Sequence, residues 1–168
     1  MSQGPIKFRL FTGVRQGSRR QVGILQGDNE LDITTGIAAL KENQRRDLLS
    51  RVQRWLDGFD GPKNWFHNFP NDQICPACFV FKVGNHRFYG YLYHPLPKTD
   101  SGLQLCVLCS HAIKHEWETD PAEKSLVSRW YQSSEAKAAL AAEFKDTLLK
   151  DKKAKDSKGR REGSPWKM

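Results

Sequence analysis

A predicted β-hairpin constrains the fold of this chain more than any other feature. The dipeptide Gly84-Asn85 lies between residues 79–83 and 86–93, two segments rich in aromatic and β-branched side chains. Glycine and asparagine both tolerate the positive φ angles that a tight two-residue turn requires. Since side chains alternate along a strand, one face of the second segment should be cationic and aromatic. The residues expected on that face are Arg87, Tyr89, Tyr91 and Tyr93.

A third strand and a helix are predicted after the hairpin. Residues 103–109 form a nearly continuous apolar run, which is typical of a central strand buried on both faces. Polar residues follow at positions 110–115. Asp120 and Pro121 then predict the start of a helix, as an N-cap followed by proline at the first helical position, with Glu123 in the first turn.

The first half of the chain predicts two short strands and an amphipathic helix. Residues 6–10 alternate between apolar and basic side chains, and residues 21–25 suit a second short strand. Helical character begins after Thr34 or Thr35, and an apolar stripe follows at helical spacing. Its members are Leu48, Leu49, Val52, Trp55, Leu56 and Phe59, of which we expect Trp55 and Phe59 in the core. Residues 60–62 should end this helix and an ordered loop should run to Cys75.

This order of elements indicates an α+β fold. We expect a small antiparallel or mixed sheet packed by N-terminal and C-terminal helices. The length of 168 residues suits one core, so residues 1–149 are expected to form a single domain. Residues 150–168 carry five of the eight net positive charges and few apolar residues, so we expect a disordered basic tail. Such a tail suits either contact with phosphate backbones or solubility.

The sequence favours a cytoplasmic protein that is not embedded in a membrane. No apolar run approaches the roughly 20 residues that cross a bilayer, and residues 1–5 lack the apolar core of a signal peptide. In the cytoplasm the four cysteines should be reduced or metal-bound.

The central segment resembles the RelE/ParE toxin superfamily, and in particular its HigB-like, phage-derived branch. The resemblance is carried by a charged strand, an apolar strand that ends in a basic cluster, and a helix that begins at a Thr-Pro-like step. It lies in residues 81–84, 87–90, 105–114 and 118–123. His115 departs from the pattern, since a second lysine is expected there.

The resemblance implies the toxin of a toxin–antitoxin pair, commonly an endoribonuclease that cleaves mRNA at the ribosome. Its expected partners are mRNA, the ribosome and a cognate antitoxin protein. Attack of a ribose 2′-hydroxyl on the adjacent phosphate needs a proton acceptor, a proton donor and fixed positive charge. The candidates are His111 and His115 for proton transfer, Arg87 and Lys114 for the phosphate, and Lys82, Tyr89 and Tyr91 for RNA binding. Pairing of Arg87 with a helix carboxylate is the structural alternative.

We expect a protein without a cofactor or metal ion, and a zinc site is the alternative. Cys75 and Cys78 form one C-x2-C pair, and Cys106 and Cys109 form a second pair 27 residues later. Four thiolates in such pairs can complete a tetrahedral zinc site. In an extended strand, however, Cys106 and Cys109 should point to opposite faces and cannot bind one ion. The alternative functions are therefore a non-catalytic RNA-binding or zinc-ribbon module, or a subunit whose exposed sheet edge binds another chain.

Overall fold

A computed structural model describes residues 6–26, 33–94, 103–113 and 121–142 of the protein. Two of the candidate catalytic residues, Lys114 and His115, lie outside these ranges. The basic tail at residues 150–168 also lies outside them.

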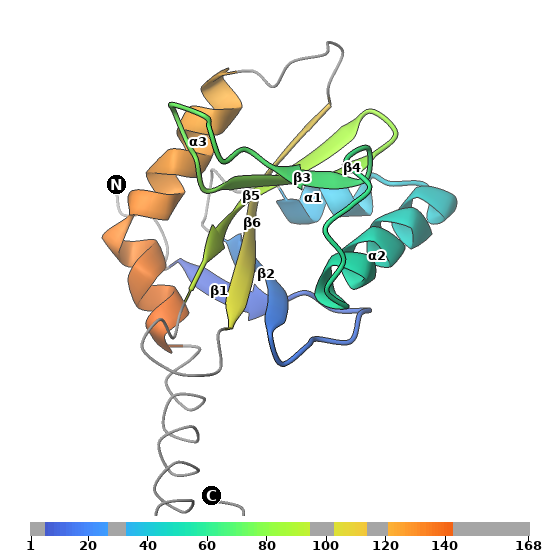
Figure 1. Ribbon diagram of the computed structural model, residues 1–168, viewed down its shortest axis with the longest axis horizontal. Coiled ribbons are helices and arrows are strands. Elements are labelled where there is room, and N and C mark those ends of the chain that lie inside the picture. Colours follow the sequence, from blue (N-terminus) through green and yellow to red (C-terminus); the bar gives the residue numbers. More distant parts are fainter. Residues whose placement is uncertain (1–5, 27–32, 95–102, 114–120, 143–168) are drawn as a thin grey trace, which may run out of the picture.

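The described residues form six strands and a set of helices (Figure 1). The strands are β1 (Lys7–Leu10), β2 (Arg20–Gln26), β3 (Phe66–Asn68), β4 (Cys78–Val83), β5 (His86–Tyr93) and β6 (Gln104–Ile113). The helices are α1 (Ile33–Ala38), α2 (Glu42–Leu56) and α3 (Pro121–Gln132), followed by helical residues 134–142. None of the helices formed by described residues has the length and apolar character needed to cross a bilayer.

The six strands form one mixed sheet in the order β1-β2-β6-β5-β4-β3. Strands β2 and β6 pair in parallel, and every other neighbouring pair is antiparallel. The predicted hairpin is confirmed, since Val83 pairs with His86 across the turn and Gly84 has a φ of 56°. The α+β class is confirmed as well.

Helices cover both faces of the sheet, so the chain has two apolar cores. Helices α1 and α2 cover one face, here called the α2 face, and α3 covers the other, here called the α3 face (Figure 1). On the α2 face Trp55 packs against Phe79 and Phe81, with ring centroids 5.6 and 6.5 Å away. On the α3 face Val127 and Trp130 pack against the sheet. A sheet covered in this way leaves its ends and edge strands for contacts with ligands.

Strand β6 is the central strand that the apolar run predicts. Leu105 and Val107 point to the α3 face, and Cys106 and Leu108 point to the α2 face. All four are fully buried. The prediction that Cys106 and Cys109 point to opposite faces is also confirmed.

A β-bulge interrupts the alternation of β6 at Cys109. Tyr89 of β5 pairs with Ser110, but the next residue, Gly90, pairs with Leu108, so Cys109 has no partner in the register. An extra residue in one strand shifts all later side chains by one position relative to the sheet faces. Cys109 and Ser110 therefore both lie on the α3 face. The next residue, His111, lies on the α2 face.

The predicted end of the long helix was wrong. Helix α2 ends at Leu56, and the expectation that Phe59 is a core residue fails, because its side chain is 50% exposed. The stop is at Gly58, which has a φ of 101°. The N–H of Gly58 donates to the carbonyl of Trp55, and the N–H of Phe59 donates to that of Arg54. This is the glycine-based Schellman arrangement that closes helices.

Two further features of the structure differ from the prediction, a divided helix and an additional short strand. The helical region is divided into α1 and α2, because Lys41 is extended and its N–H donates to Gln44 Oε1 at 3.0 Å. The predicted loop before Cys75 contains β3, a three-residue strand at the sheet edge. Three residues are too few for a periodic pattern to identify.

The close approach of β5 to β6 at the bulge predicts a strong effect of Gly90→Ala. A Cβ on Gly90 would lie 2.1 Å from the carbonyl oxygen of Val107, a backbone atom of the paired strand. We expect the free energy of unfolding to fall by about 2 kcal/mol or more, measured by urea denaturation. Gly61→Ala is the control, since its Cβ would meet no atom nearer than 3.9 Å. Equal effects of the two substitutions would contradict this register.

Candidate functional site

Most of the described candidate residues lie at one end of the sheet, where the β4–β5 turn meets the end of β6. In the register His86 pairs with Ile113, and Arg87 pairs with Ala112. Alternation along β5 sends these two neighbours to opposite faces. The candidates therefore form two groups, one on the α2 face and one on the α3 face.

The α2-face group is a pair of histidines. The distance from His86 Nδ1 to His111 Nε2 is 3.0 Å, and the ring centroids are 5.2 Å apart. Phe88 packs beside them, with its centroid 4.9 Å from that of His111. A hydrogen bond between two imidazoles requires one ring to donate and the other to accept, so the pair can hold and transfer a proton. Sequence reasoning missed His86, although its place next to the turn puts it opposite the end of β6.

Helix α1 holds His111 in place through a glycine. A Cβ on Gly36 would lie 2.3 Å from Cγ of the His111 ring, so only glycine allows this approach. The β-bulge at Cys109 is the reason that His111 faces α1 at all. With regular alternation from Leu108, His111 would point to the α3 face together with Arg87.

The α3-face group is a pair of cations, Lys82 and Arg87. They are partners in the β4–β5 register, so their side chains share one face and lie next to each other. Arg87 Nη1 donates to the carbonyls of Gly84 at 2.7 Å and of His86 at 2.9 Å, which anchors the guanidinium to the turn. Burial lowers the pKa of Arg87 from its ordinary value.

Arg87 does not fulfil the structural alternative of pairing with a helix carboxylate. Within the described ranges it forms no ion pair, and its buried Nε has no hydrogen-bond partner. The carboxylate of Glu123, in the first turn of α3, has another partner, because Ser110 Oγ donates to Glu123 Oε2 at 2.8 Å. This bond ties the first turn of α3 to β6. Arg87 therefore retains donor capacity at the end of the sheet.

The expectation that Tyr89 and Tyr91 stack on RNA bases was wrong. Their side chains are 2% and 1% exposed and lie in the core under α3. The Tyr91 ring packs edge-on against Tyr131 with centroids 5.3 Å apart, and burial raises the pKa of Tyr91. Strand alternation correctly predicted that these tyrosines lie on the same face of β5 as Arg87. Sequence reasoning did not predict that helix α3 covers this face.

The four cysteines do not meet at one point. Cys75, Cys78 and Cys109 belong to the core of the α3 face, whereas Cys106 lies on the α2 face. Among the described residues no group of three or more histidine, cysteine or carboxylate side chains is placed to hold a metal ion. A hydrogen bond from Cys78 lowers the pKa of the Cys75 thiol, and the same contact together with burial raises that of Cys78.

The loop that carries Cys75 is fastened to α3 by Asp72. Its carboxylate accepts the N–H groups of Ile74 at 2.9 Å and Cys75 at 2.8 Å. The same carboxylate pairs with Lys124 of α3, and both side chains are less than 20% exposed. The hydrogen bond from Lys124 and that from Cys75 hold the pKa of Asp72 below its usual value of 3.8.

No family model, no curated protein and no solved structure matched the chain.

The lowered pKa of Asp72 predicts a pH-dependent effect of Asp72→Asn. Near pH 7 the charged pair with Lys124 is complete, and its loss should reduce the free energy of unfolding by about 1 kcal/mol. A carboxylate with a depressed folded-state pKa stabilises above 3.8 and loses this contribution as the pH falls through its folded-state pKa. The difference in stability between the two proteins should therefore shrink as the pH falls below 3.8, as measured by urea denaturation across pH.

Asp47→Asn is the control for this series, because Asp47 is exposed on α2 and has no ion pair with another described residue. A difference between the wild type and Asp72→Asn that grows as the pH falls below 3.8 would contradict the account.

Proposed function

We propose that this chain is an RNA-directed toxin of the RelE/HigB type that binds RNA phosphate at Lys82 and Arg87 and cleaves the bound strand. The observation that carries the proposal is the placement of these two cations as direct partners on neighbouring strands. Among the described residues the buried Nε of Arg87 has no hydrogen-bond partner, and a guanidinium with donors to spare beside a second cation suits an anion.

The order of elements supports the proposal. Strand β2, helices α1 and α2, the β4–β5 hairpin, strand β6 and the proline-started helix α3 follow one another along the chain. This is the order on which the resemblance to RelE/HigB-like toxins rests. The two cations lie where the hairpin turn meets the end of β6, which is where the resemblance predicts the basic cluster.

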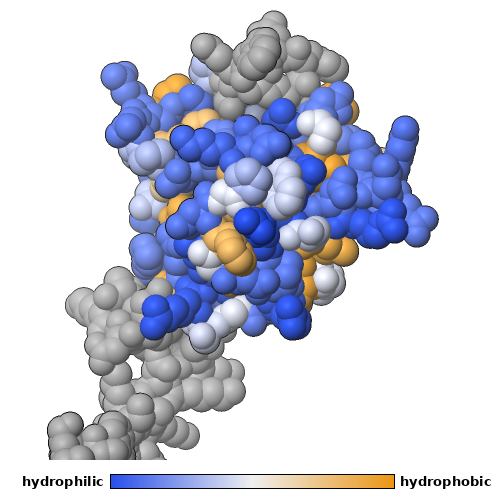
Figure 2. All heavy atoms as spheres, turned by 45° about the vertical axis from the view of Figure 1, so that its right-hand side comes forward, coloured by the Kyte–Doolittle hydropathy of each residue, from blue (hydrophilic) through white to orange (hydrophobic). Residues whose placement is uncertain are grey.

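An aromatic and cationic surface on the α2 face, next to the backbone of Lys82, supports RNA as the ligand. The N–H of Lys82 donates to the carbonyl of Trp65 at 2.8 Å. The guanidinium of Arg51 lies 5.3 Å from the centroid of the Trp65 ring, and that of Arg54 lies 5.5 Å from Trp65 and 4.2 Å from Phe59. Hydrophilic side chains predominate on the side of the molecule seen in Figure 2. Aromatic rings flanked by arginines suit unpaired bases and their phosphates.

Cleavage would proceed by attack of a ribose 2′-hydroxyl on the adjacent phosphate. Lys82 and Arg87 would hold one phosphate of the strand by charge-assisted hydrogen bonds. Because His111 and Arg87 lie on opposite faces, one phosphate cannot contact both, so the cleaved bond would lie around the end of the sheet, beside the His86–His111 pair. There the catalytic role of His111 stays a prediction: the pair would accept the proton of the 2′-hydroxyl and return a proton to the leaving 5′-oxygen.

The second candidate function is RNA binding without cleavage. It is favoured by the surface of Phe59 and Trp65 with its arginines, which needs no proton transfer. The two candidates share the ligand and differ in whether the RNA is cut. An experiment that follows binding and cleavage separately therefore distinguishes them.

Lys82→Glu and the double variant Lys82→Glu/Arg87→Glu test the proposal. We expect affinity for a single-stranded RNA of about 12 nucleotides to fall roughly tenfold or more per lost charge contact at moderate salt. Cleavage of that RNA, on its own or with ribosomes, and the arrest of growth on induced expression should be lost with it. Binding is measured by fluorescence anisotropy and cleavage by gel electrophoresis.

Arg129→Glu is the matched control, since this exposed α3 arginine makes the same charge change away from the end of the sheet. Thermal unfolding checks that Lys82→Glu remains folded.

His111→Gln should leave RNA affinity unchanged and reduce cleavage if the histidine transfers a proton. Unchanged binding and growth arrest in the Lys82 and Arg87 variants would contradict the proposal. RNA binding by the wild type with no cleavage in any of these assays would favour the second candidate.

A further inference from the structure

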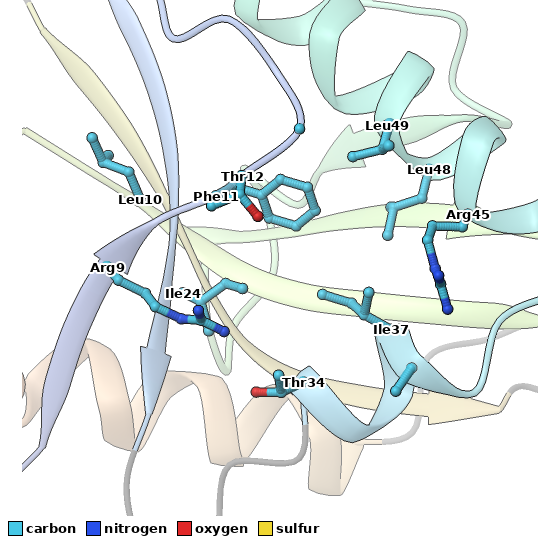
Figure 3. A pocket seen from close by; sticks show the side chains of 12 residues that line it. Arg9, Leu10, Phe11, Thr12, Ile24, Thr34, Ile37, Arg45, Leu48 and Leu49 are labelled. Carbon is cyan, nitrogen blue, oxygen red and sulfur yellow. The ribbon is translucent and has the colours of Figure 1, made fainter.

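A hollow lies between β1, α1 and α2, on the α2 face of the sheet and away from the Lys82 and Arg87 pair. It has a volume of about 470 Å³, within the range of small-molecule sites. Its walls are aliphatic and aromatic, as the close-up in Figure 3 shows. The apolar side chains in its lining are Leu10, Phe11, Ile24, Ile37, Leu48 and Leu49.

Two arginines provide the charge of this cavity. Arg9 reaches it from β1 and Arg45 from α2, on opposite sides of the apolar wall formed by Ile24 and Ile37 (Figure 3). Both arginines are exposed, and within the described part of the chain neither guanidinium has a hydrogen-bond or ion-pair partner. Other arginines nearby are engaged. Arg20, for example, donates to carbonyls of Trp55 and Phe59 and pairs with Asp60.

The chemistry of the lining selects a class of ligand. A guanidinium offers a planar fork of donors that matches a carboxylate or a phosphate group. The apolar wall offers no hydrogen bonds to the edge of a nucleobase, and the hydroxyl of Thr34 is already bonded to Gln26 Nε2 at 2.8 Å. An aliphatic body would instead gain from burial against Phe11, Ile24 and Leu48.

We propose that this cavity is a binding site for a small anionic amphiphile, a carboxylate or phosphate monoester on an aliphatic body of about ten carbons. The head group binds at one side of the apolar wall and the chain lies along the wall toward the other side. The positive charges of both Arg9 and Arg45 favour an anion over a neutral or cationic ligand. The site is independent of the proposed RNA function, since none of its lining residues belongs to the Lys82 and Arg87 pair.

Sodium decanoate and decyl phosphate are the probes, and acetate, inorganic phosphate and decyltrimethylammonium are the comparisons. Isothermal titration calorimetry measures affinity, and methyl-resolved NMR locates the ligand. We expect saturable binding of the two amphiphilic anions below their micelle concentrations, with shifts of the Ile24 and Ile37 methyl groups. The methyl groups of Ile74 and Ile113, which lie away from the cavity, should not shift. Acetate and phosphate lack the chain and the ammonium compound has the wrong charge, so all three should bind at least tenfold more weakly.

Charge-reversed variants with neighbouring controls complete the test. Arg9→Glu and Arg45→Glu should each weaken decanoate binding by about tenfold, the effect of one lost charge-assisted contact. Lys7→Glu on the same strand and Arg46→Glu on the same helix make the same charge change outside the cavity and should have little effect. Lys82→Glu/Arg87→Glu should also bind decanoate normally, which separates this proposal from the RNA function.

Three outcomes would overturn the proposal. They are the absence of decanoate binding, equal loss in the Arg46→Glu and Arg45→Glu variants, and equal binding of the cationic amphiphile. Methyl shifts at Ile113 in place of Ile24 would overturn it too, because they would place the ligand at the other end of the molecule.

Discussion

Burial of β6 on both of its faces is the constraint on which the rest of the structure depends. This strand joins the parallel partner β2 to the antiparallel hairpin, and its side chains belong to both apolar cores. A strand in this position tolerates polar side chains only near its end, where burial decreases. Ser110 and His111 come at that point, and each has a polar partner, Glu123 and His86 respectively. The apolar run thus determines where polar chemistry can begin.

The β-bulge at Cys109 determines which face each polar group serves. It keeps Ser110 on the α3 face, where it fastens α3, and it directs His111 to the α2 face against α1. The two cations of the hairpin, Lys82 and Arg87, lie on the α3 face by plain alternation. The end of the sheet therefore presents positive charge on one side and imidazoles on the other. For a nucleic-acid strand this favours a path around the sheet end over a single enclosed pocket.

Much of the fold follows from local patterns. The Gly84-Asn85 turn, the apolar β6 and the proline-started α3 are each specified by residues that are neighbours in the chain. The opposite faces of Cys106 and Cys109 also follow from strand alternation alone. Gly58 could have predicted the end of α2, because a glycine near the end of an apolar stripe often closes a helix. The pair Gly61-Pro62 follows shortly after, and as a stronger helix-breaking signal it placed the predicted end too late.

The site was less predictable because it depends on tertiary contacts. The burial of Tyr89 and Tyr91 depends on which face α3 covers, and strand alternation carries no information about that. The separation of His111 from Arg87 depends on one extra residue in β6, and nothing in the apolar run indicates a bulge. His86 contacts His111, which is 25 residues later in the chain, because the pairing of β5 with β6 brings the two residues together. The cavity beside Arg9 and Arg45 joins elements from three parts of the chain and has no sequence motif.

The central claim is that the bulge in β6 places His111 on the α2 face, against Gly36 and His86. Nuclear Overhauser effects from the His111 ring protons in isotope-labelled protein test this most directly. The account predicts strong effects to the α protons of Gly36 and to the rings of His86 and Phe88. Effects from that ring to Glu123 or to the side chain of Arg87 would place His111 on the α3 face, and would contradict both the bulge and the division of the site into two groups.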